Sequence, residues 1–189
     1  MKRRFAILIP LLVFVDQVIK IVVSRFFYDP HVHFSIIDGI LTFYPHQNIH
    51  LGWIPSMLDF MMPLHLAVTL SIVTMALIFV MYRYFAFLAS SWDRYKKLPD
   101  LFLIFLFAGG FCKLIDDIYW GGSLDYIQLF DWFIFDLKDV YLSIGEVFFV
   151  VFLIVYYKQY CKIPKERRKE HKRKVNFFLW LRAGLPLEQ

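Results

Sequence analysis

The sequence predicts an all-α membrane protein with four transmembrane helices and a small extracellular β-rich subdomain. Hydrophobic residues make up 59% of the 189 residues, and aromatic residues make up 20%. These residues gather in long runs, which is typical of lipid contact. A span needs roughly 20 apolar residues, and in lipid the backbone must satisfy its own hydrogen bonds as a helix. Four segments are long enough: residues 5–27, 64–88, 101–119 and 140–157.

The basic residues orient these helices. Of the 21 Lys and Arg residues, 17 lie at the N-terminus, in the junction 83–97, in the segment 158–174, or at Arg182. Residues 28–63 and 118–137 contain none. Because cytoplasmic loops carry the excess of Lys and Arg, both termini and the loop 89–100 are expected inside the cell. The two loops without basic residues are expected outside.

The chain divides into a membrane domain, residues 1–160, and a basic cytoplasmic tail, residues 161–189. Segment 5–27 is interpreted as a retained helix, because Asp16 and Lys20 interrupt it and no cleavage site follows. A basic segment beside a membrane favours anionic lipid, so nucleic acid is not an expected partner of the tail. Its last part, residues 176–182, is expected to lie along the inner interface.

The two outer loops are expected to differ. The extracellular insertion 28–63 carries Asp38-Gly39 between β-branched and aromatic residues, which predicts a β-hairpin. Residues 51–55 are interpreted as a further short strand. The loop 118–138 is rich in Trp, Phe and Tyr, which is typical of a segment at the level of the lipid headgroups.

Ionisable residues near the spans gather at one depth. Such residues are costly in a membrane and are by default functional candidates. Asp16 and Lys20 share a helix face at positions i and i+4. Lys113 and Asp116 share a face at i and i+3. Helix rise places Asp16 and Asp116 in the outer half of the bilayer. Asp139, where the fourth span begins from the outside, and Asp125, in the apolar and aromatic strip before it, are expected in the same layer.

Closely spaced carboxylates favour acid–base chemistry. Two of them in a low dielectric can share one proton, so one can take a proton from water while its partner protonates the substrate. Such a pair hydrolyses a peptide bond without a metal. The spacing leaves three alternatives open: an acid–base pair, a cation-binding pocket, or structural pairing. The loop histidines have no standard zinc spacing, so no metal site is expected.

Several blocks of the sequence resemble a known family. Two of them, Gly109-Gly-x-x-Lys-Leu-Ile-Asp116 and Gly121-x-x-Leu-Asp125-Tyr-Ile, together with Phe135-Asp-Leu-Lys-Asp139, are similar to the C-terminal signatures of bacterial lipoprotein signal peptidase (signal peptidase II). Asp16-Gln-x-x-Lys20 resembles the first-helix block of that family. Leu41-Thr-Phe-Tyr-x-x-x-Asn48 resembles the segment that leads to its loop asparagine. The resemblance covers roughly residues 10–150.

The resemblance implies a function and a site. Members are aspartic endopeptidases that cleave the signal peptide of diacylglyceryl-modified prolipoproteins before the lipidated cysteine. By position, Asp125 and Asp139 would be catalytic, and Asp116 would support them. Asn48 would lie over the site, and Asp16 and Lys20 would brace the helices. The resemblance further implies no cofactor, a monomer, a prolipoprotein substrate with membrane lipid as the other partner, and a location in the bacterial cell membrane.

Four positions depart from the family pattern close to these carboxylates. Lys113 and Asp136 replace asparagines, Asp117 replaces an arginine, and Lys138 replaces an alanine. Because two lysines and two acids are introduced, new pairs are expected, for example Lys113 with Asp117 or with Asp136. Lys113 and Asp136 are therefore added to the supporting or substrate-binding residues. The alternative function is a catalytically inactive paralogue that binds lipoproteins without cutting them.

Overall fold

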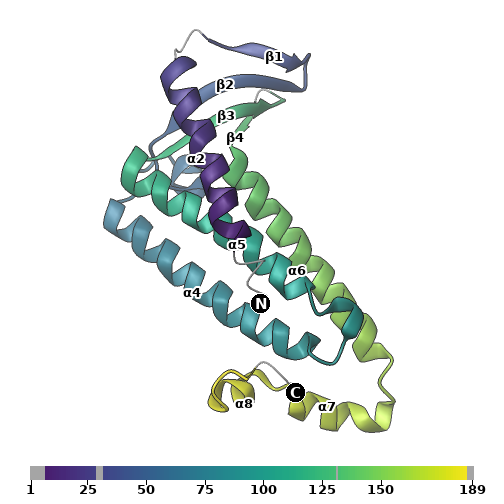
Figure 1. Ribbon diagram of the computed structural model, residues 1–189. Helices are drawn as coiled ribbons and strands as arrows, with labels where there is room; N and C mark the ends of the chain where they lie inside the picture. The colour runs from purple at the N-terminus through teal and green to yellow at the C-terminus, as the bar shows by residue number, and fades with distance from the viewer. Residues whose placement is uncertain (1–6, 29–31, 131, 187–189) are drawn as a thin grey trace.

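Four long helices form the body of the protein. The computed structural model describes residues 7–28, 32–130 and 132–186. The helices are α2 (Leu8–Phe26), α4 (Leu64–Ala89), α5 (Leu98–Ile115) and α6 (Leu137–Cys161). Helix α5 packs against each of the other three, and α2 crosses its upper half (Figure 1).

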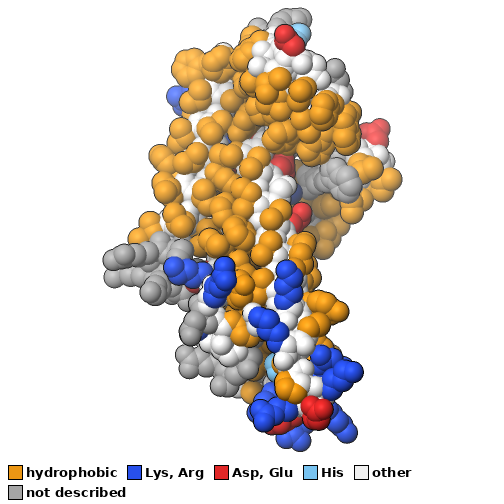
Figure 2. All heavy atoms as spheres, turned by 90° about the vertical axis from the view of Figure 1, so that its right-hand side faces the viewer, with side chains coloured by type: hydrophobic (Ala, Val, Ile, Leu, Met, Phe, Trp, Pro, Cys, Tyr) orange, Lys and Arg blue, Asp and Glu red, His pale blue; other side chains and the backbone are white. Residues whose placement is uncertain are grey.

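Three stretches are long and apolar enough to cross a membrane: α4, α6, and α5 with the turn that follows it to Trp120. Their outward faces carry exposed apolar side chains, which form the broad apolar surface in Figure 2. Helix α2 has 19 residues but includes Asp16, Lys20 and Arg25. The mainly helical membrane fold with a small sheet is therefore confirmed, and the fourth span remains a prediction.

Close packing of α5 on α6 depends on small residues. A Cβ atom added to Gly109 would lie 2.6 Å from Leu142 Cδ2, and one added to Gly145 would lie 2.5 Å from Leu106 Cδ2. Both distances are far below van der Waals contact. Glycine at these two positions lets the helix backbones approach.

The sheet lies at one end of the bundle and has four antiparallel strands in chain order. These are β1 (Phe34–Ile37), β2 (Leu41–Asn48), β3 (Ser123–Leu129) and β4 (Phe133–Phe135). The hairpin at Asp38-Gly39 is confirmed, with Gly39 at φ 70°. The loop 118–138 was expected only to rest at the headgroups, yet it supplies β3 and β4. Its β-branched and aromatic residues suit a strand as well as an interface.

The predicted strand at residues 51–55 is wrong. This segment enters a short helix, α3 (Trp53–Met57), with Gly52 at its N-cap. Pro55 explains the difference. Proline has no N–H to donate to a strand ladder, but it fits the first turn of a helix.

The basic tail folds back onto the bundle. After the single turn η3 (Lys165–Arg167) it forms α7 (Arg168–Lys174) and α8 (Phe177–Arg182). Trp180 of α8 is only 3% exposed and packs on Tyr84 of α4, with ring centroids 5.1 Å apart. The Tyr84 hydroxyl donates a hydrogen bond of 2.5 Å to the carbonyl of Val175. The predicted location of residues 176–182 along the membrane interface remains a prediction.

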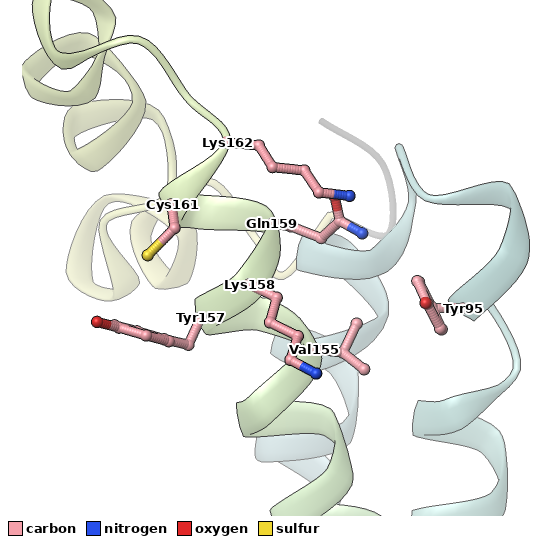
Figure 3. A pocket seen from close by; sticks show the side chains of 7 residues that line it. All are labelled: Tyr95, Val155, Tyr157, Lys158, Gln159, Cys161 and Lys162. Carbon is pink, nitrogen blue, oxygen red and sulfur yellow. The ribbon is translucent and has the colours of Figure 1, made fainter.

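The end of the bundle opposite the sheet is basic. Lys and Arg side chains gather there in Figure 2. A cavity of about 310 Å³ lies between the end of α6 and the turn η1 (Asp93–Tyr95). Lys158 and Lys162 extend toward Tyr95 in this cavity, whereas Tyr157 points to the other side of the helix (Figure 3). Positive charge and the sheet therefore mark opposite ends of the molecule.

Candidate active site

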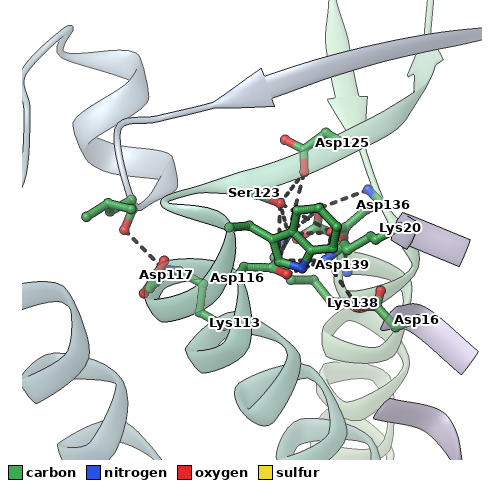
Figure 4. A network of polar contacts seen from close by, with 12 residues as sticks. Asp16, Lys20, Lys113, Asp116, Asp117, Ser123, Asp125, Asp136, Lys138 and Asp139 are labelled. Atoms are coloured by element: carbon green, nitrogen blue, oxygen red, sulfur yellow. Dashed lines mark hydrogen bonds and ion pairs between the residues drawn. The ribbon is translucent and has the colours of Figure 1, made fainter. Parts of the chain in front are cut away.

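The predicted carboxylates meet where the sheet adjoins the middle of α2, the end of α5 and the start of α6 (Figure 4). Helix α5 ends in a wider π-helical turn, η2 (Asp116–Trp120), and both of its aspartates are buried. Single π-helical turns are rare and are found frequently at functional sites. Here the turn directs Asp116 toward α2 and Asp117 toward Lys113.

The start of α6 positions Asp139. Asp136 is the N-cap residue, and its carboxylate accepts a hydrogen bond of 3.2 Å from the backbone N–H of Asp139. The Asp139 carboxylate accepts one of 3.2 Å from the N–H of Asp136. This reciprocal capping box fixes both side chains. The positive end of the helix dipole also stabilises negative charge at this place.

Strand β3 brings Asp125 to the same place. Ser123 stands two residues earlier on the strand, and its hydroxyl donates a hydrogen bond of 2.5 Å to the Asp125 carboxylate. One carboxylate oxygen from each of Asp125, Asp136 and Asp139 lies within 4.8 Å of the others. The fold therefore brings together the two residues predicted to be catalytic, although 13 residues separate them in the chain.

Asp125 and Asp139 line a cavity of about 210 Å³. Asn48, at the end of β2, lines it too, as do Lys113 and Asp117. The Asp125 side chain is 9% exposed and that of Asp139 is 35% exposed, so Asp125 is nearly buried and Asp139 is partly exposed at the cavity. This space can hold a water molecule and part of a peptide.

Lys20 joins three carboxylates beneath this cavity. Its Nζ lies 2.6 Å from Asp116, 2.7 Å from Asp136 and 3.1 Å from Asp16, and its side chain is fully buried. The predicted pairing of Asp16 with Lys20 is confirmed. Because Lys20 binds carboxylates from three separate elements, it links α2 to the turn η2 and to the start of α6.

Lys113 takes Asp117, one of its two expected partners. Its Nζ lies 2.5 Å from the Asp117 carboxylate and 3.1 Å from the carbonyl of Leu51. Asp116, which shares a helix face with Lys113 at i,i+3, pairs with Lys20 instead. The pairing with Asp117 is confirmed. Asp136 binds Lys20 and Lys138 in place of Lys113.

Ser123 and the contacts of Lys138 were not predicted. The Lys138 Nζ lies 2.5 Å from the Ser123 hydroxyl and 2.8 Å from the Asp136 carboxylate. An alternating strand through Asp125 would have placed Ser123 on the same face. That signal was missed because residues 123–129 were not expected to form a strand.

The electrostatics suit a carboxylate pair that shares one proton. Burial raises the pKa of the Asp125 carboxyl, and the attraction of Lys138 and the Ser123 hydrogen bond partly oppose this shift. A raised pKa favours the protonated form of the carboxyl. Asp125, Asp136 and Asp139 have the oxygens to hold a cation, but the Lys138 ammonium already supplies the positive charge among them. We therefore assign no metal site.

Comparisons with known proteins place this arrangement in a family. The family model described as signal peptidase (SPase) II, Peptidase_A8, matches residues 8–155. A search of curated protein sequences finds no match. One similar solved structure, described as a bacterial membrane enzyme, has a TM-score of 0.65 and 21% identity, covering 87% of this chain and 94% of its own. Another of the same description has a TM-score of 0.61 and 20% identity, covering 81% and 94%.

The two structures share the fold, and the family match includes each element that carries a carboxylate of the site, from α2 to the first part of α6. Signal peptidase II enzymes are membrane-embedded aspartic peptidases that process lipoprotein signal peptides. This chain belongs to the signal peptidase II family.

Proposed function

We propose that this protein is an intramembrane aspartyl endopeptidase that cleaves diacylglyceryl-modified prolipoproteins before the lipidated cysteine. The single observation that carries the proposal is the approach of Asp125 and Asp139 at one cavity, with carboxylate oxygens within 4.8 Å. Family membership supports the same activity. Asp16, Lys20, Asp116 and Asp136 are assigned to bracing this pair, because they pair with one another beneath the cavity.

The geometry suggests a direct hydrolytic route. The ionised member of the pair takes a proton from a water molecule in the cavity, and the water oxygen bonds to the carbonyl carbon of the scissile peptide. The protonated member donates its proton to the carbonyl oxygen. Return of a proton to the leaving nitrogen completes cleavage. Each carboxylate thus exchanges its role as acid and base during one turnover.

An apolar groove beside this cavity supports the proposal that the substrate is lipid-modified. It has a volume of about 260 Å³ and is lined by α4, α5 and α6, with Met75, Leu106 and Gly110 among its residues. Leu51, Lys113 and Leu142 line both the groove and the cavity of the carboxylates. We assign the groove to the apolar part of the substrate, which would enter from the lipid, and Asn48 to contact with the peptide.

The same proposal includes four spans, cytoplasmic termini and a location in the bacterial cell membrane. Helix α2 supports the fourth span, because Asp16 and Lys20 are fully buried and paired while Leu11 and Phe14 are exposed on its outer face. The basic residues at the end opposite the sheet support cytoplasmic termini. The sheet would then lie outside the cell, above the site.

Prolipoprotein processing in cells tests the activity. The chain is expressed in bacteria that lack their own enzyme of this type, together with Asp125→Asn and Asp139→Asn variants. Wild type should convert the precursor. The rate of cleavage should fall about 100-fold or more in each variant, which is the usual contribution of an acid–base residue. An uncut precursor beside wild-type protein that is folded in the membrane would refute the enzymatic function.

One observation favours a second candidate function. The Lys138 Nζ lies 3.5 Å from Asp125 and 3.8 Å from Asp139, at a position where the family pattern has an uncharged residue. A paralogue that binds lipoproteins without cutting them would tolerate such a charge. It predicts saturable binding of a lipopeptide by the wild type with no product at any pH.

A further inference from the structure

Lys138 occupies the centre of the carboxylate cluster. Its side chain is 6% exposed, and its Nζ lies within 3.8 Å of four carboxylates (Figure 4). The distances are 2.8 Å to Asp136, 3.5 Å to Asp116, 3.5 Å to Asp125 and 3.8 Å to Asp139. So dense a set of acceptors keeps the amine protonated, because an opposite charge at this distance favours the charged form.

Lys138 also reaches Asp125 through a hydroxyl. Its Nζ donates to the Ser123 oxygen at 2.5 Å, and that hydroxyl donates to Asp125 at 2.5 Å. Lys138 immediately precedes Asp139 in the first turn of α6. The ammonium thus contacts Asp125 through the Ser123 hydroxyl. The first turn of α6 holds it beside Asp139.

The elements around this cluster carry other basic side chains, but these have other partners or are exposed. The other lysines are otherwise engaged: Lys20 binds Asp16, Asp116 and Asp136, and Lys113 binds Asp117. On β2, His46 lies opposite Asp125 in the sheet and is exposed. Within the described ranges, Lys138 is the cation whose amine is within 4 Å of both Asp125 and Asp139.

We propose that Lys138 is the built-in counter-ion of the Asp125–Asp139 pair and sets the pH at which that pair takes up its shared proton. It is a positioning residue, since it acts through the two carboxylates. The effect on proton uptake follows from the short distances between Lys138 and the two carboxylates. Its consequence for peptide cleavage rests on the proposed function.

The sign of the effect follows from charge. A cation this close favours the ionised form of the carboxylates. The wild-type pair therefore takes up its proton at a lower pH than the same pair without the ammonium. Catalysis requires the singly protonated pair, so removal of the charge moves both limbs of the pH–rate profile upward.

Four variants test this in the full-length protein. Lys138→Met removes the charge and keeps the length of the side chain, and Lys138→Gln removes the charge but retains a donor for Asp136. Lys138→Arg keeps the charge. Lys174→Met removes a lysine from an exposed ion pair with Glu170 in the tail and serves as the matched control. We expect the optimum for cleavage to rise by about one unit or more in either neutral variant, and to stay in place in the arginine variant and the control.

A second measurement does not depend on turnover. Infrared titration records the protonated-carboxyl band of the pair, which is assigned by its loss in Asp125→Asn and Asp139→Asn. We expect the band to persist to higher pH than in the wild type, in whichever of the two neutral variants folds. Proton uptake at the wild-type pH in that variant would overturn the inference. Shifted uptake in a protein that cuts no precursor would instead support the inference and refute the proposed peptidase.

Discussion

Seven charged side chains are buried around one small site. They are Asp16, Lys20, Asp116, Asp117, Asp125, Asp136 and Lys138. A buried charge is tolerated only when a partner compensates for its lost hydration. Here Lys20 and Lys138 both pair with Asp116 and Asp136, and Lys113 pairs with Asp117. Removal of one lysine therefore leaves several carboxylates without their main partner.

Lys20→Met should be strongly destabilising. The substitution removes the ammonium from three buried carboxylates, and breaking a buried ion pair from one side costs about 3–5 kcal/mol. Unfolding of the purified protein in detergent, followed by circular dichroism, measures the change. Lys174→Met removes an exposed ion pair and should change the stability little, because solvent screens such a pair. Equal stability of the two variants would contradict this network.

Ser123→Ala should move the pH profile upward. The Ser123 hydroxyl hydrogen-bonds to the Asp125 carboxylate and lowers its pKa. Without the hydroxyl the pKa of Asp125 rises further, so the ionised form is reached only at higher pH. The pH dependence of precursor cleavage checks this. Ser143→Ala, on an exposed position of α6, is the control and should leave the profile unchanged.

The sequence predicted the common depth of the charged residues better than the contacts between them. Helix rise placed Asp16 and Asp116 at a common depth, and the i,i+4 spacing predicted the pairing of Asp16 with Lys20. Spacing did not select Asp125 and Asp139 as the proposed catalytic pair; that choice came from the family resemblance. The contact of Lys138 with Ser123 depends on how β3 packs against the start of α6. A local sequence pattern cannot predict such a tertiary contact.

At the level of elements, the contact between α5 and α6 determines the shape of the site. Asp116 follows the last residue of α5, and Asp139 lies in the first turn of α6. Gly109 and Gly145 allow the two backbones to approach closely. A change in that spacing would move the two carboxylates relative to one another.

Gly145→Ile should separate these helices. Even the Cβ would lie 2.5 Å from Leu106 Cδ2 and 3.2 Å from the Leu106 backbone nitrogen, so the helix itself must shift. Overpacking of this kind costs about 1–3 kcal/mol. We expect a lower melting temperature and reduced cleavage. Ala76→Ile, on an exposed face of α4, should leave both unchanged. A variant as stable and active as wild type would show that the close approach is not needed.

Strands were harder to predict than helices. The β1–β2 turn carries Asp38-Gly39, a strong hairpin signal. The β3–β4 turn lacks such a signal: Phe130 takes a φ of 50°, a conformation that favours glycine. Tertiary pairing with β2 supports that turn. Long-range pairing of this kind cannot be read from local sequence.

The whole molecule has two chemically distinct ends. The sheet and the carboxylate pair lie toward one end, and the basic α7 and the docked α8 lie at the other (Figure 1). Charge distribution along the sequence predicted this polarity. The packing of Trp180 on Tyr84 was not predicted, because contacts between a tail and a distant helix leave no periodic trace.

Thiol labelling tests the orientation in the membrane. Cys161 is exposed and free at the basic end, whereas Cys112 is buried. A membrane-impermeant maleimide should label Cys161 only after spheroplasts are permeabilised. In a Cys161→Ser background, Asp38→Cys in the β1–β2 turn should be labelled in intact spheroplasts. Labelling of Cys161 in intact spheroplasts would contradict cytoplasmic termini.

The most direct test of the central claim uses purified protein and a synthetic diacylglyceryl-modified precursor peptide. Mass spectrometry identifies the products. We predict that the wild type cuts the single bond before the lipidated cysteine, and that folded Asp125→Asn and Asp139→Asn variants leave the peptide intact. Uncut peptide with folded wild-type protein across the pH range, or unchanged cleavage by either variant, would contradict the account.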